Sequence, residues 1–289
     1  MTTSTTTTST TSTTSTTKAD LVAQGQQNAL DEWAVTSAPP STPLLGSALL
    51  ERSETIVDLT RPLYEGMPMW FGHQKTFTPT NQDHDKFMEL HHTEIGFYAR
   101  NLIISEHAGT HTDATIEYDP AGLPIEKLPL EMYWGSAVCL DMSEAQFSDP
   151  DPDCVGWATE DVVKRAEAKL EAAGQSIRPG DIVLAWFDYG DRHFPTPQYI
   201  NHNPGFSWDG LEYLAKKGIV NIGTDCSAID HSTDTRFSGH MVCKKYGLVN
   251  TEHLANLGSL VNTRFQFYGL PLNITGGTGS PIRAIAVLS

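Results

Sequence analysis

One short stretch gathers residue types that bind metal ions. The segment HAGTHTDATIE, residues 107–117, holds two histidines, an aspartate and a closing glutamate. In a straight strand His107 and His111 would lie about 13 Å apart at ~3.3 Å per residue, too far to share one ion. Gly109 lets the chain curl, and one turn of roughly helical pitch would bring both histidines to one side. Asp113 would then complete a cup of donors that suits Zn²⁺, Mn²⁺ or Fe²⁺.

The same stretch has a plainer interpretation. It fits a surface loop whose histidines hydrogen-bond to the backbone, and the spacing alone leaves this alternative open. A cup of three ligands would leave coordination positions free for water, which is typical of catalytic sites. Three nearby histidines in HDKFMELHH show no ligand spacing and are expected to be solvated: His84, His91 and His92.

The surrounding chain predicts a mixed α/β domain that positions this segment. Apolar or β-branched runs of strand length occur throughout it, namely NLIISEH, SAVCLDM, DIVLAWF, IVNIGTD and PIRAIAVL. Two segments predict helices. ATEDVVKRAEAKLEAAG has Thr159 as N-cap and ends at Gly174, and SWDGLEYLAKKG has Ser207 and Gly218 in these roles. More strand than helix indicates a curled or barrel-like sheet with a few flanking helices.

Composition excludes several classes of partner. The 289 residues are expected to form one main domain. Acidic residues outnumber basic ones 35 to 19, and no Lys/Arg cluster is present, so nucleic acid is not an expected partner. The four cysteines form no CxxC pair, which favours reduced thiols in the cytoplasm and excludes a finger-type zinc site.

The N-terminal region is expected to lie outside the domain. Residues 1–17 are almost entirely threonine and serine and predict a disordered tail. Residues 18–52 have helix-forming composition followed by prolines and predict an arm, with Trp33 available to pack on the body or on a neighbouring subunit. The domain is expected over residues 53–289. No secretory signal or membrane-spanning run is expected.

At this point the chain resembles a known family. The cyclase family of metal-dependent hydrolases, which includes bacterial kynurenine formamidases and isatin hydrolases, carries the pattern HxGTHxDxPxH. HAGTHTDATIE matches its first seven positions. The resemblance continues through NPGFSWDGLEYLAKKGIVNIGTDCSAID and GLPLNITGGTGSPIRAIAV, so that only about the first fifty residues fall outside it. It implies a swivelling β/β/α fold, an oligomer, and a site for one or two metal ions.

The resemblance also implies a ligand set. His107, His111 and Asp113 would bind the first ion. His240 lies twelve residues before Glu252, the spacing that the family uses for a second ion. Asp113, His240 and Glu252 would therefore complete that second site, and the expected ions are Zn²⁺ or Mn²⁺.

The chain departs from the family pattern at two positions. Thr115 stands where the family has proline, and Glu117 stands where it has a final histidine that the formamidases use as general acid/base. A carboxylate can accept a proton from metal-bound water and return it to the leaving group, so we favour Glu117 as the proton shuttle. Two other interpretations stay open: Glu117 is an extra metal ligand, or its side chain points away.

Several aromatic residues are candidates for the substrate pocket. Trp70 and Phe71 lie in a loop where family members place substrate contacts, and we expect them to bind substrate. AWFDYGDRHF contributes Trp186, Phe187 and Tyr189, for which core packing is the alternative. GGTGSP lacks the lysine and helix of a phosphate loop and is read as a turn near the site that carries backbone amides.

The expected function is hydrolysis of a C–N bond in a small, aromatic or cyclic amide by metal-activated water, as in arylformamidases and isatin hydrolases. The alternatives are hydrolysis of a lactone or other cyclic ester at the same site, or a non-catalytic metal-binding relative. Expected partners are a small-molecule substrate and further copies of the chain in a homodimer or homotetramer, with no nucleic acid and no membrane.

Overall fold

The computed structural model describes residues 54–147 and 156–288. The predicted tail and the predicted arm with Trp33 lie outside these residues. Within them, three cysteines are buried free thiols: Cys139, Cys226 and Cys243. In this part of the chain no helix is both long enough and apolar enough to cross a membrane.

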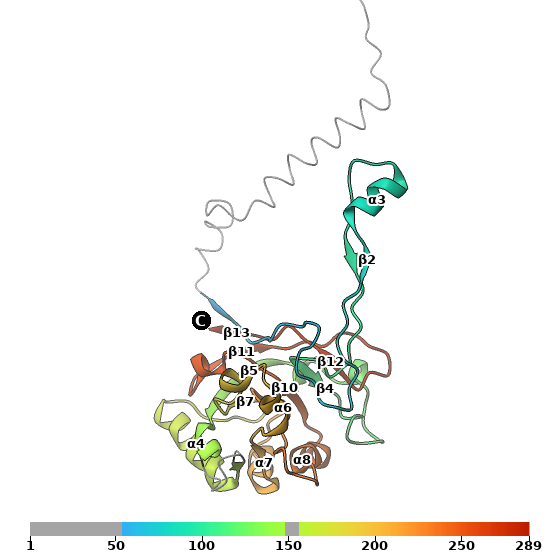
Figure 1. Cartoon of the computed structure of the whole chain (residues 1–289). Helices are drawn as coiled ribbons and strands as arrows, with labels where there is room; N and C mark the ends of the chain where they lie inside the picture. The colour runs from blue at the N-terminus through green and yellow to red at the C-terminus, as the bar shows by residue number, and fades with distance from the viewer. Residues whose placement is uncertain (1–53, 148–155, 289) are drawn as a thin grey trace, which may run out of the picture. The chain divides into compact units, whose positions relative to one another are not determined.

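A mixed sheet of nine strands organises the domain (Figure 1). The strand order is β1-β13-β11-β5-β7-β9-β10-β4-β12, so the sheet stays open, with β1 and β12 as its edges. The central strands β5, β7, β9 and β10 pair in parallel, and the outer pairs are antiparallel. The strands are β1 (Thr55–Asp58), β4 (His111–Asp113), β5 (Trp134–Asp141), β7 (Ile182–Trp186), β9 (Asn221–Thr224), β10 (Val249–Glu252), β11 (Arg264–Tyr268), β12 (Gly279–Pro281) and β13 (Ile285–Leu288).

The central strands are buried on both faces, which explains their continuous apolar sequences. In β5, Ala137 and Cys139 pack into one core cluster, while Val138 and Leu140 pack into the cluster on the opposite face. Side chains of a strand alternate between faces, so each face needs its own apolar partners. The predicted strands in SAVCLDM, DIVLAWF, IVNIGTD and PIRAIAVL are confirmed.

Three helices lie on one side of the sheet: α4 (Glu160–Ala172), α7 (Trp208–Ala215) and α8 (Ser238–Tyr246) (Figure 1). Both predicted helices are confirmed, with Thr159 and Ser207 at their N-caps. Ser207 Oγ accepts from the Gly210 amide at 3.4 Å, whereas the Thr159 side chain makes no capping bond. Shorter elements are α3 (His84–His91), α5 (Gly190–His193), α6 (Pro197–Asn201), η1 (Ile125–Lys127), η2 (Leu130–Met132), η3 (Ser143–Phe147), η4 (Leu257–Leu260), and the small sheets β2 (Thr80–Gln82) with β3 (Ala99–Arg100) and β6 (Trp157–Ala158) with β8 (Gly205–Phe206).

Helix α8 lacks the start signal that predicts the other two helices. Its N-cap is Phe237, with φ at +52° and no capping side chain. The Asp234 carboxylate accepts instead from the Ser238 amide at 2.7 Å. This helix carries His240, so its placement decides one corner of the site.

The predicted strand NLIISEH is wrong. Within residues 101–107 only Ile103 makes a bridge, with Phe77, at the base of an arm formed by residues 77–103. The arm projects from the domain, with α3 near its tip (Figure 1). Its apolar residues suggested a strand because of their composition, yet Leu102 and Ile103 are 57% and 48% exposed.

Candidate metal centre

Strands β4 and β10 present the middle of the site from one face of the sheet. In their antiparallel register His111 lies opposite Glu252, so the two side chains leave the same face. Asp113 follows His111 by two residues and shares that face. All three residues are buried, with Asp113 only 1% exposed. The register therefore brings together two expected ligand residues that are distant in the sequence.

The chain curls between His107 and His111 and brings the two residues together, but the curl is not the helical turn that the sequence predicts. Residues 106–110 form a turn and a bend, not a helical turn, with Gly109 at φ +61°. The two imidazole rings meet edge to face with centroids 5.2 Å apart. Gly279 on β12 makes room, because a Cβ there would lie 2.7 Å from His107 Cε1.

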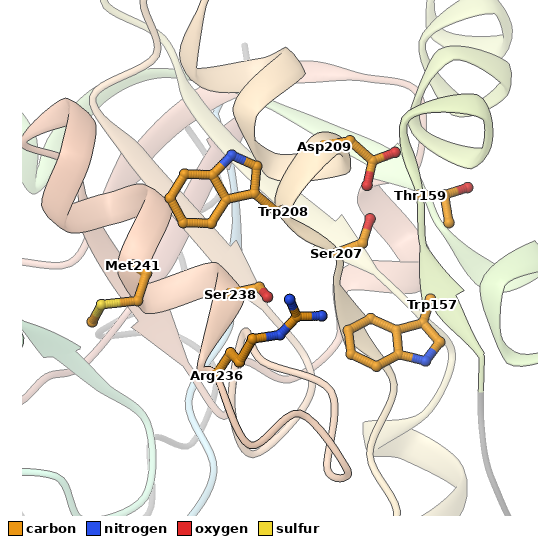
Figure 2. A pocket seen from close by; sticks show the side chains of 8 residues that line it. All are labelled: Trp157, Thr159, Ser207, Trp208, Asp209, Arg236, Ser238 and Met241. Carbon is orange, nitrogen blue, oxygen red and sulfur yellow. The ribbon is translucent and has the colours of Figure 1, made fainter.

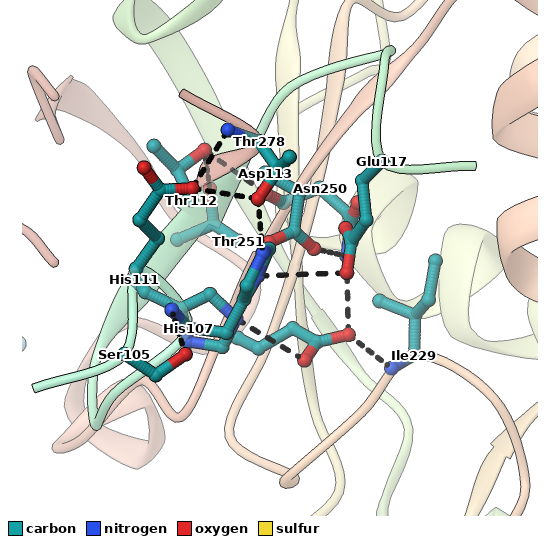
Figure 3. A network of polar contacts seen from close by, with 12 residues as sticks. Ser105, His107, His111, Thr112, Asp113, Glu117, Ile229, Asn250, Thr251 and Thr278 are labelled. Carbon is teal, nitrogen blue, oxygen red and sulfur yellow. Dashed lines mark hydrogen bonds and ion pairs between the residues drawn. The ribbon is translucent and has the colours of Figure 1, made fainter. Parts of the chain in front are cut away.

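Hydrogen bonds fix the orientation of the His107 ring. His107 Nε2 lies 2.9 Å from Thr278 Oγ1, whose hydroxyl donates to Glu106 Oε2 at 2.7 Å. Since the threonine proton is used in that second bond, Nε2 must be the donor to Thr278. Nδ1 then faces Asp113 Oδ1, 2.7 Å away, where it donates to the carboxylate when the ring is protonated and would be free to bind an ion when it is neutral (Figure 3).

His111 shows the same arrangement with its nitrogens exchanged. Its Nδ1 donates to the Gly109 carbonyl at 2.8 Å. Its Nε2 lies 3.3 Å from Asp113 Oδ1 and 3.6 Å from Glu252 Oε2. A metal-binding histidine typically donates its second nitrogen to an acceptor in this way, which leaves the first free to bind the ion.

His240 reaches the cluster from α8. Its Nδ1 bonds to the Asp230 carboxylate, which also accepts the Gly239 amide at 2.6 Å. Its Nε2 lies 3.9 Å from Asp113 Oδ2 and 3.8 Å from Glu252 Oε1. All three histidines thus turn one nitrogen inward toward carboxylates.

The donor atoms form three overlapping groups in the described chain. Within each group one donor atom per residue lies within 4.8 Å of the others. The groups are His107, His111 and Asp113; Asp113, His240 and Glu252; and His111, Glu252 and His253. The first two are the expected sets, so the structure brings all five expected ligand residues together.

The charges of the cluster fit a divalent cation. Burial and the Asp113 charge raise the pKa of Glu252 to about 7 and that of Glu117 to about 9. Burial also raises the pKa of Asp113, but His111 and His107 outweigh it and hold that pKa well below its usual range. Crowded buried carboxylates repel one another, and a cation among them would offset this repulsion. The donor types, the ring orientations and the charge of the cluster therefore all fit a divalent cation.

Glu117 faces the cluster from the turn after β4 (Figure 3). Its Oε1 lies 3.5 Å from His107 Nδ1, and its side chain is 26% exposed. Thr115, at the position of the family's proline, accepts the Leu123 amide at 2.9 Å and so helps to shape this turn. The geometry does not leave the Glu117 carboxylate pointing away from the site.

Sequence reasoning missed several supporting residues. Asn250 Nδ2 donates to Asp113 Oδ2 at 2.6 Å and to Glu252 Oε1 at 3.1 Å. Its position two residues before Glu252 places it on the same strand face, a signal that the sequence contains. Asp230 and Thr278 carry no such local signal. The GGTGSP turn lies near the site as expected, but Thr278 contacts His107 through its hydroxyl and not through a backbone amide.

A stack of rings extends outward from the centre. The His73 ring stacks on the His107 ring with centroids 5.1 Å apart and planes inclined by 28°, and the Trp70 ring centroid lies 5.1 Å from that of His73. His73, which lies next to the expected substrate residues Trp70 and Phe71, was not predicted from the sequence. Phe71 is 90% exposed and contacts Trp70 at 4.2 Å. The other aromatic candidates belong to the core: Phe187 and Tyr189 are fully buried in one core cluster, and Trp186 packs against the other.

A separate hollow of about 690 Å³ lies near the starts of α4, α7 and α8 (Figure 2). It is lined by Trp157, Thr159, Ser207, Trp208, Asp209, Arg236, Ser238 and Met241. None of these residues belongs to the donor groups. The hollow is therefore distinct from the candidate metal centre.

Comparisons with known proteins agree with the architecture. The family model described as "Putative cyclase" matches residues 57–231. An isatin hydrolase of Roseibium aggregatum is 27% identical over 264 residues, covering 84% of this chain and 95% of that protein. A kynurenine formamidase of Salinibacter ruber is 25% identical over 233 residues, covering 80% of this chain and 96% of that protein.

Solved structures give the same result for the fold. Isatin hydrolase A from Ralstonia solanacearum superimposes with a TM-score of 0.70 at 22% identity, over 88% of this chain and 99% of that chain. The α/β fold expected from the family resemblance is confirmed.

Proposed function

Because the chain belongs to the cyclase family, we propose that it is a metal-dependent hydrolase that cleaves a C–N bond of a small amide. The observation that carries this proposal is the inward convergence of three imidazole nitrogens on two buried carboxylates. Such a mixed histidine and carboxylate set is typical of catalytic sites for divalent ions.

His107, His111 and Asp113 would hold one ion, and Asp113, His240 and Glu252 a second. A bound Zn²⁺ or Mn²⁺ ion would polarise the substrate carbonyl and make a bound water more acidic. Asp230 and Thr278 keep the imidazoles in the required orientation through their hydrogen bonds.

Glu117 is the proposed proton shuttle. Its carboxylate would take a proton from the attacking water and return it to the leaving nitrogen. In the metal-free site burial and Asp113 raise the pKa of Glu117 to about 9, and a bound dication would lower it toward neutral pH, where the carboxylate can accept a proton and return it. Glu117 Oε1 lies 3.5 Å from His107 Nδ1, so the carboxylate stands at the edge of the donor cluster.

The outward ring stack supports an aromatic or cyclic substrate. Trp70 and His73 continue from His107 toward the exposed Phe71 ring, so a flat substrate could lie against them. N-formyl aromatic amines and isatin are the substrate types that the relatives' names suggest. We propose a cytoplasmic enzyme that acts on such a small molecule and has no nucleic acid partner.

We also propose that the chain forms a homodimer or homotetramer. The arm, residues 77–103, carries apolar side chains without a core of its own, and α3 has no buried residue. Its exposed apolar residues are Phe77, Leu90, Phe97, Tyr98, Leu102 and Ile103. A second copy of the chain would remove this surface from water.

A substrate screen tests the proposed activity. Purified protein loaded with Zn²⁺ or Mn²⁺ is assayed with N-formylkynurenine, isatin and a lactone, before and after chelation. We expect amide hydrolysis that chelation abolishes and that His111→Ala lacks. His84→Ala, which alters an exposed histidine on the arm, is the matched control and should keep full activity. Turnover of the lactone alone would show that the substrate is an ester and not an amide. No turnover of any substrate would contradict the proposal.

A further inference from the structure

His253 directly follows Glu252 and is an unusual residue for its backbone position. Its φ is +58°, in the left-handed region that glycine and asparagine tolerate best. Its N–H donates to the Cys226 carbonyl at 2.9 Å, and its own carbonyl accepts from Thr110 Oγ1 at 2.7 Å. A histidine held in this conformation costs free energy that glycine would not, so the side chain calls for an explanation.

The imidazole of His253 is buried beside the centre. The residue is 4% exposed, and its ring lies 5.6 Å from the His111 ring and 5.3 Å from the Tyr199 ring. Its Nδ1 has no hydrogen-bond partner among the described residues. A buried polar atom without a partner is unfavourable, and such atoms in native structures commonly serve a ligand.

One donor atom of His253 lies near those of two expected ligand residues. His111, Glu252 and His253 place these atoms within 4.8 Å of one another. Ligands bind a zinc-sized ion at ~2.0–2.2 Å, so two ligands of one ion lie at most about 4.4 Å apart. A small rotation of the side chains closes the remaining difference.

We infer that His253 is a further ligand of the metal centre and completes a donor set with His111 and Glu252. The inference rests on the proposed metal site and adds a residue to it. His253 adds a fourth imidazole to a centre in which His107, His111 and His240 already provide three. Imidazole suits Zn²⁺ and Co²⁺, whereas Mn²⁺ is suited by carboxylate and water ligands. His253 should therefore bias the centre toward Zn²⁺.

Two substitutions remove the imidazole while keeping the backbone conformation. His253→Gly and His253→Asn both suit a positive φ, so neither should strain the backbone, and asparagine also keeps part of the side-chain volume. The chain also offers a matched control. His92 has φ +52° at the end of α3 and is exposed, so His92→Gly makes the same exchange away from the centre.

The experiment measures metal binding and not turnover. Chelator-treated full-length protein is titrated with Co²⁺, followed by its ligand-field absorption, and with Zn²⁺ and Mn²⁺ in competition with a chromophoric chelator. We expect both His253 variants to change the Co²⁺ spectrum, to lose about 10-fold or more in Zn²⁺ affinity, and to lose less in Mn²⁺ affinity.

The outcomes separate this inference from the proposed function. Wild-type Co²⁺ spectra and Zn²⁺ affinity in both His253 variants, alongside lost binding in His111→Ala, would overturn the role of His253 and leave the proposed centre intact. A wild-type chain that binds none of the three ions would overturn both. Equal losses in His92→Gly and His253→Gly would also overturn it, because the effect would then not come from the centre.

Discussion

The histidines of the site are held by partners that fix which nitrogen faces inward. His240 depends on Asp230, which accepts its Nδ1–H and the Gly239 amide. Asp230→Ala should therefore lower the affinity for one ion by about 10–100-fold. Zn²⁺ titration of chelator-treated protein measures this.

The control for this prediction is Asp234→Ala, since Asp234 binds the start of the same helix at the Ser238 amide without touching His240. Equal metal affinity in the wild type and in Asp230→Ala would show that Asp230 does not position His240.

Glu117 is the residue at which this chain departs most from its family pattern. Glu117→Gln keeps the shape of the side chain and removes its basicity. A proton shuttle contributes about 10²–10⁴-fold, so kcat should fall by that factor while the bound metal is retained. Kinetics together with metal analysis test this. Loss of metal would make Glu117 a ligand, and an unchanged kcat with full metal would exclude the shuttle role.

Proton release links pH to metal binding at this site. In an unfolded chain a glutamate has a pKa of about 4.3, whereas burial and Asp113 raise the pKa of Glu252 to about 7 and that of Glu117 to about 9. The folded, metal-free protein thus binds more protons and loses stability as pH rises through this window. An ion must displace these protons, so apparent metal affinity should increase from pH 6 to pH 9.

Calorimetry in buffers of different ionisation enthalpy measures the released protons. Glu117→Gln should release fewer protons than the wild type above pH 7. Metal binding with an affinity independent of pH would contradict this linkage.

At the scale of elements, an ion pair with a buried carboxylate joins the sheet across β5. Arg264 on β11 pairs through both terminal nitrogens with the two carboxylate oxygens of Asp181, at 2.8 Å each, at the start of β7. Asp181 is 3% exposed. Asp181→Ala removes this partner, while the guanidinium keeps Ser136 Oγ and the Ser176 carbonyl, and should lower the free energy of unfolding by about 1.5–3 kcal/mol.

Denaturant unfolding measures this loss. The exposed pair of Arg283 with Asp58 gives the control, because Arg283→Ala should cost no more than about 1 kcal/mol. Similar losses in the two variants would refute the assigned importance of the pair of Arg264 with Asp181.

The elements that could be predicted are those with local signals. Helices α4 and α7 start at Thr159 and Ser207 and end before glycines, and strands β5 and β7 are continuous apolar runs. Helix α8 could not be predicted, because it begins after Phe237 and its start is satisfied by the more distant Asp234.

The residues of the candidate site also fall into those that the sequence predicts and those that it does not. The family resemblance named the five donor residues, because their spacing survives in the sequence. The partners that orient them, such as Asn250 and Thr278, depend on strand register and on contacts across as many as 171 residues. His253 stayed hidden because its importance lies in a backbone angle and an unpartnered nitrogen.

At the scale of the whole molecule, the exposed apolar residues of the arm have no packing partner within one copy of the described chain. Leu90 and Phe97 are 74% and 58% exposed on it. The double variant Leu90→Asp/Phe97→Asp should shift a dimer or tetramer to monomer at micromolar concentration, because a charge in an apolar contact is unfavourable. Light scattering measures the mass.

Leu272→Asp is the control, since Leu272 is 61% exposed but lies outside the arm. A wild-type monomer would refute the assembly, and an oligomer that the arm variant leaves unchanged would assign it to another surface.

We propose that this chain hydrolyses a C–N bond with a divalent ion held by His107, His111 and Asp113. The most direct test is to remove all metal, add Zn²⁺ or Mn²⁺ in steps, and measure hydrolysis of N-formylkynurenine or isatin against bound ion. We predict no activity without metal, a rise in proportion to the ion bound, and saturation at one or two equivalents per chain. Full activity in the metal-free protein, or metal that binds stoichiometrically without producing any turnover, would contradict the claim.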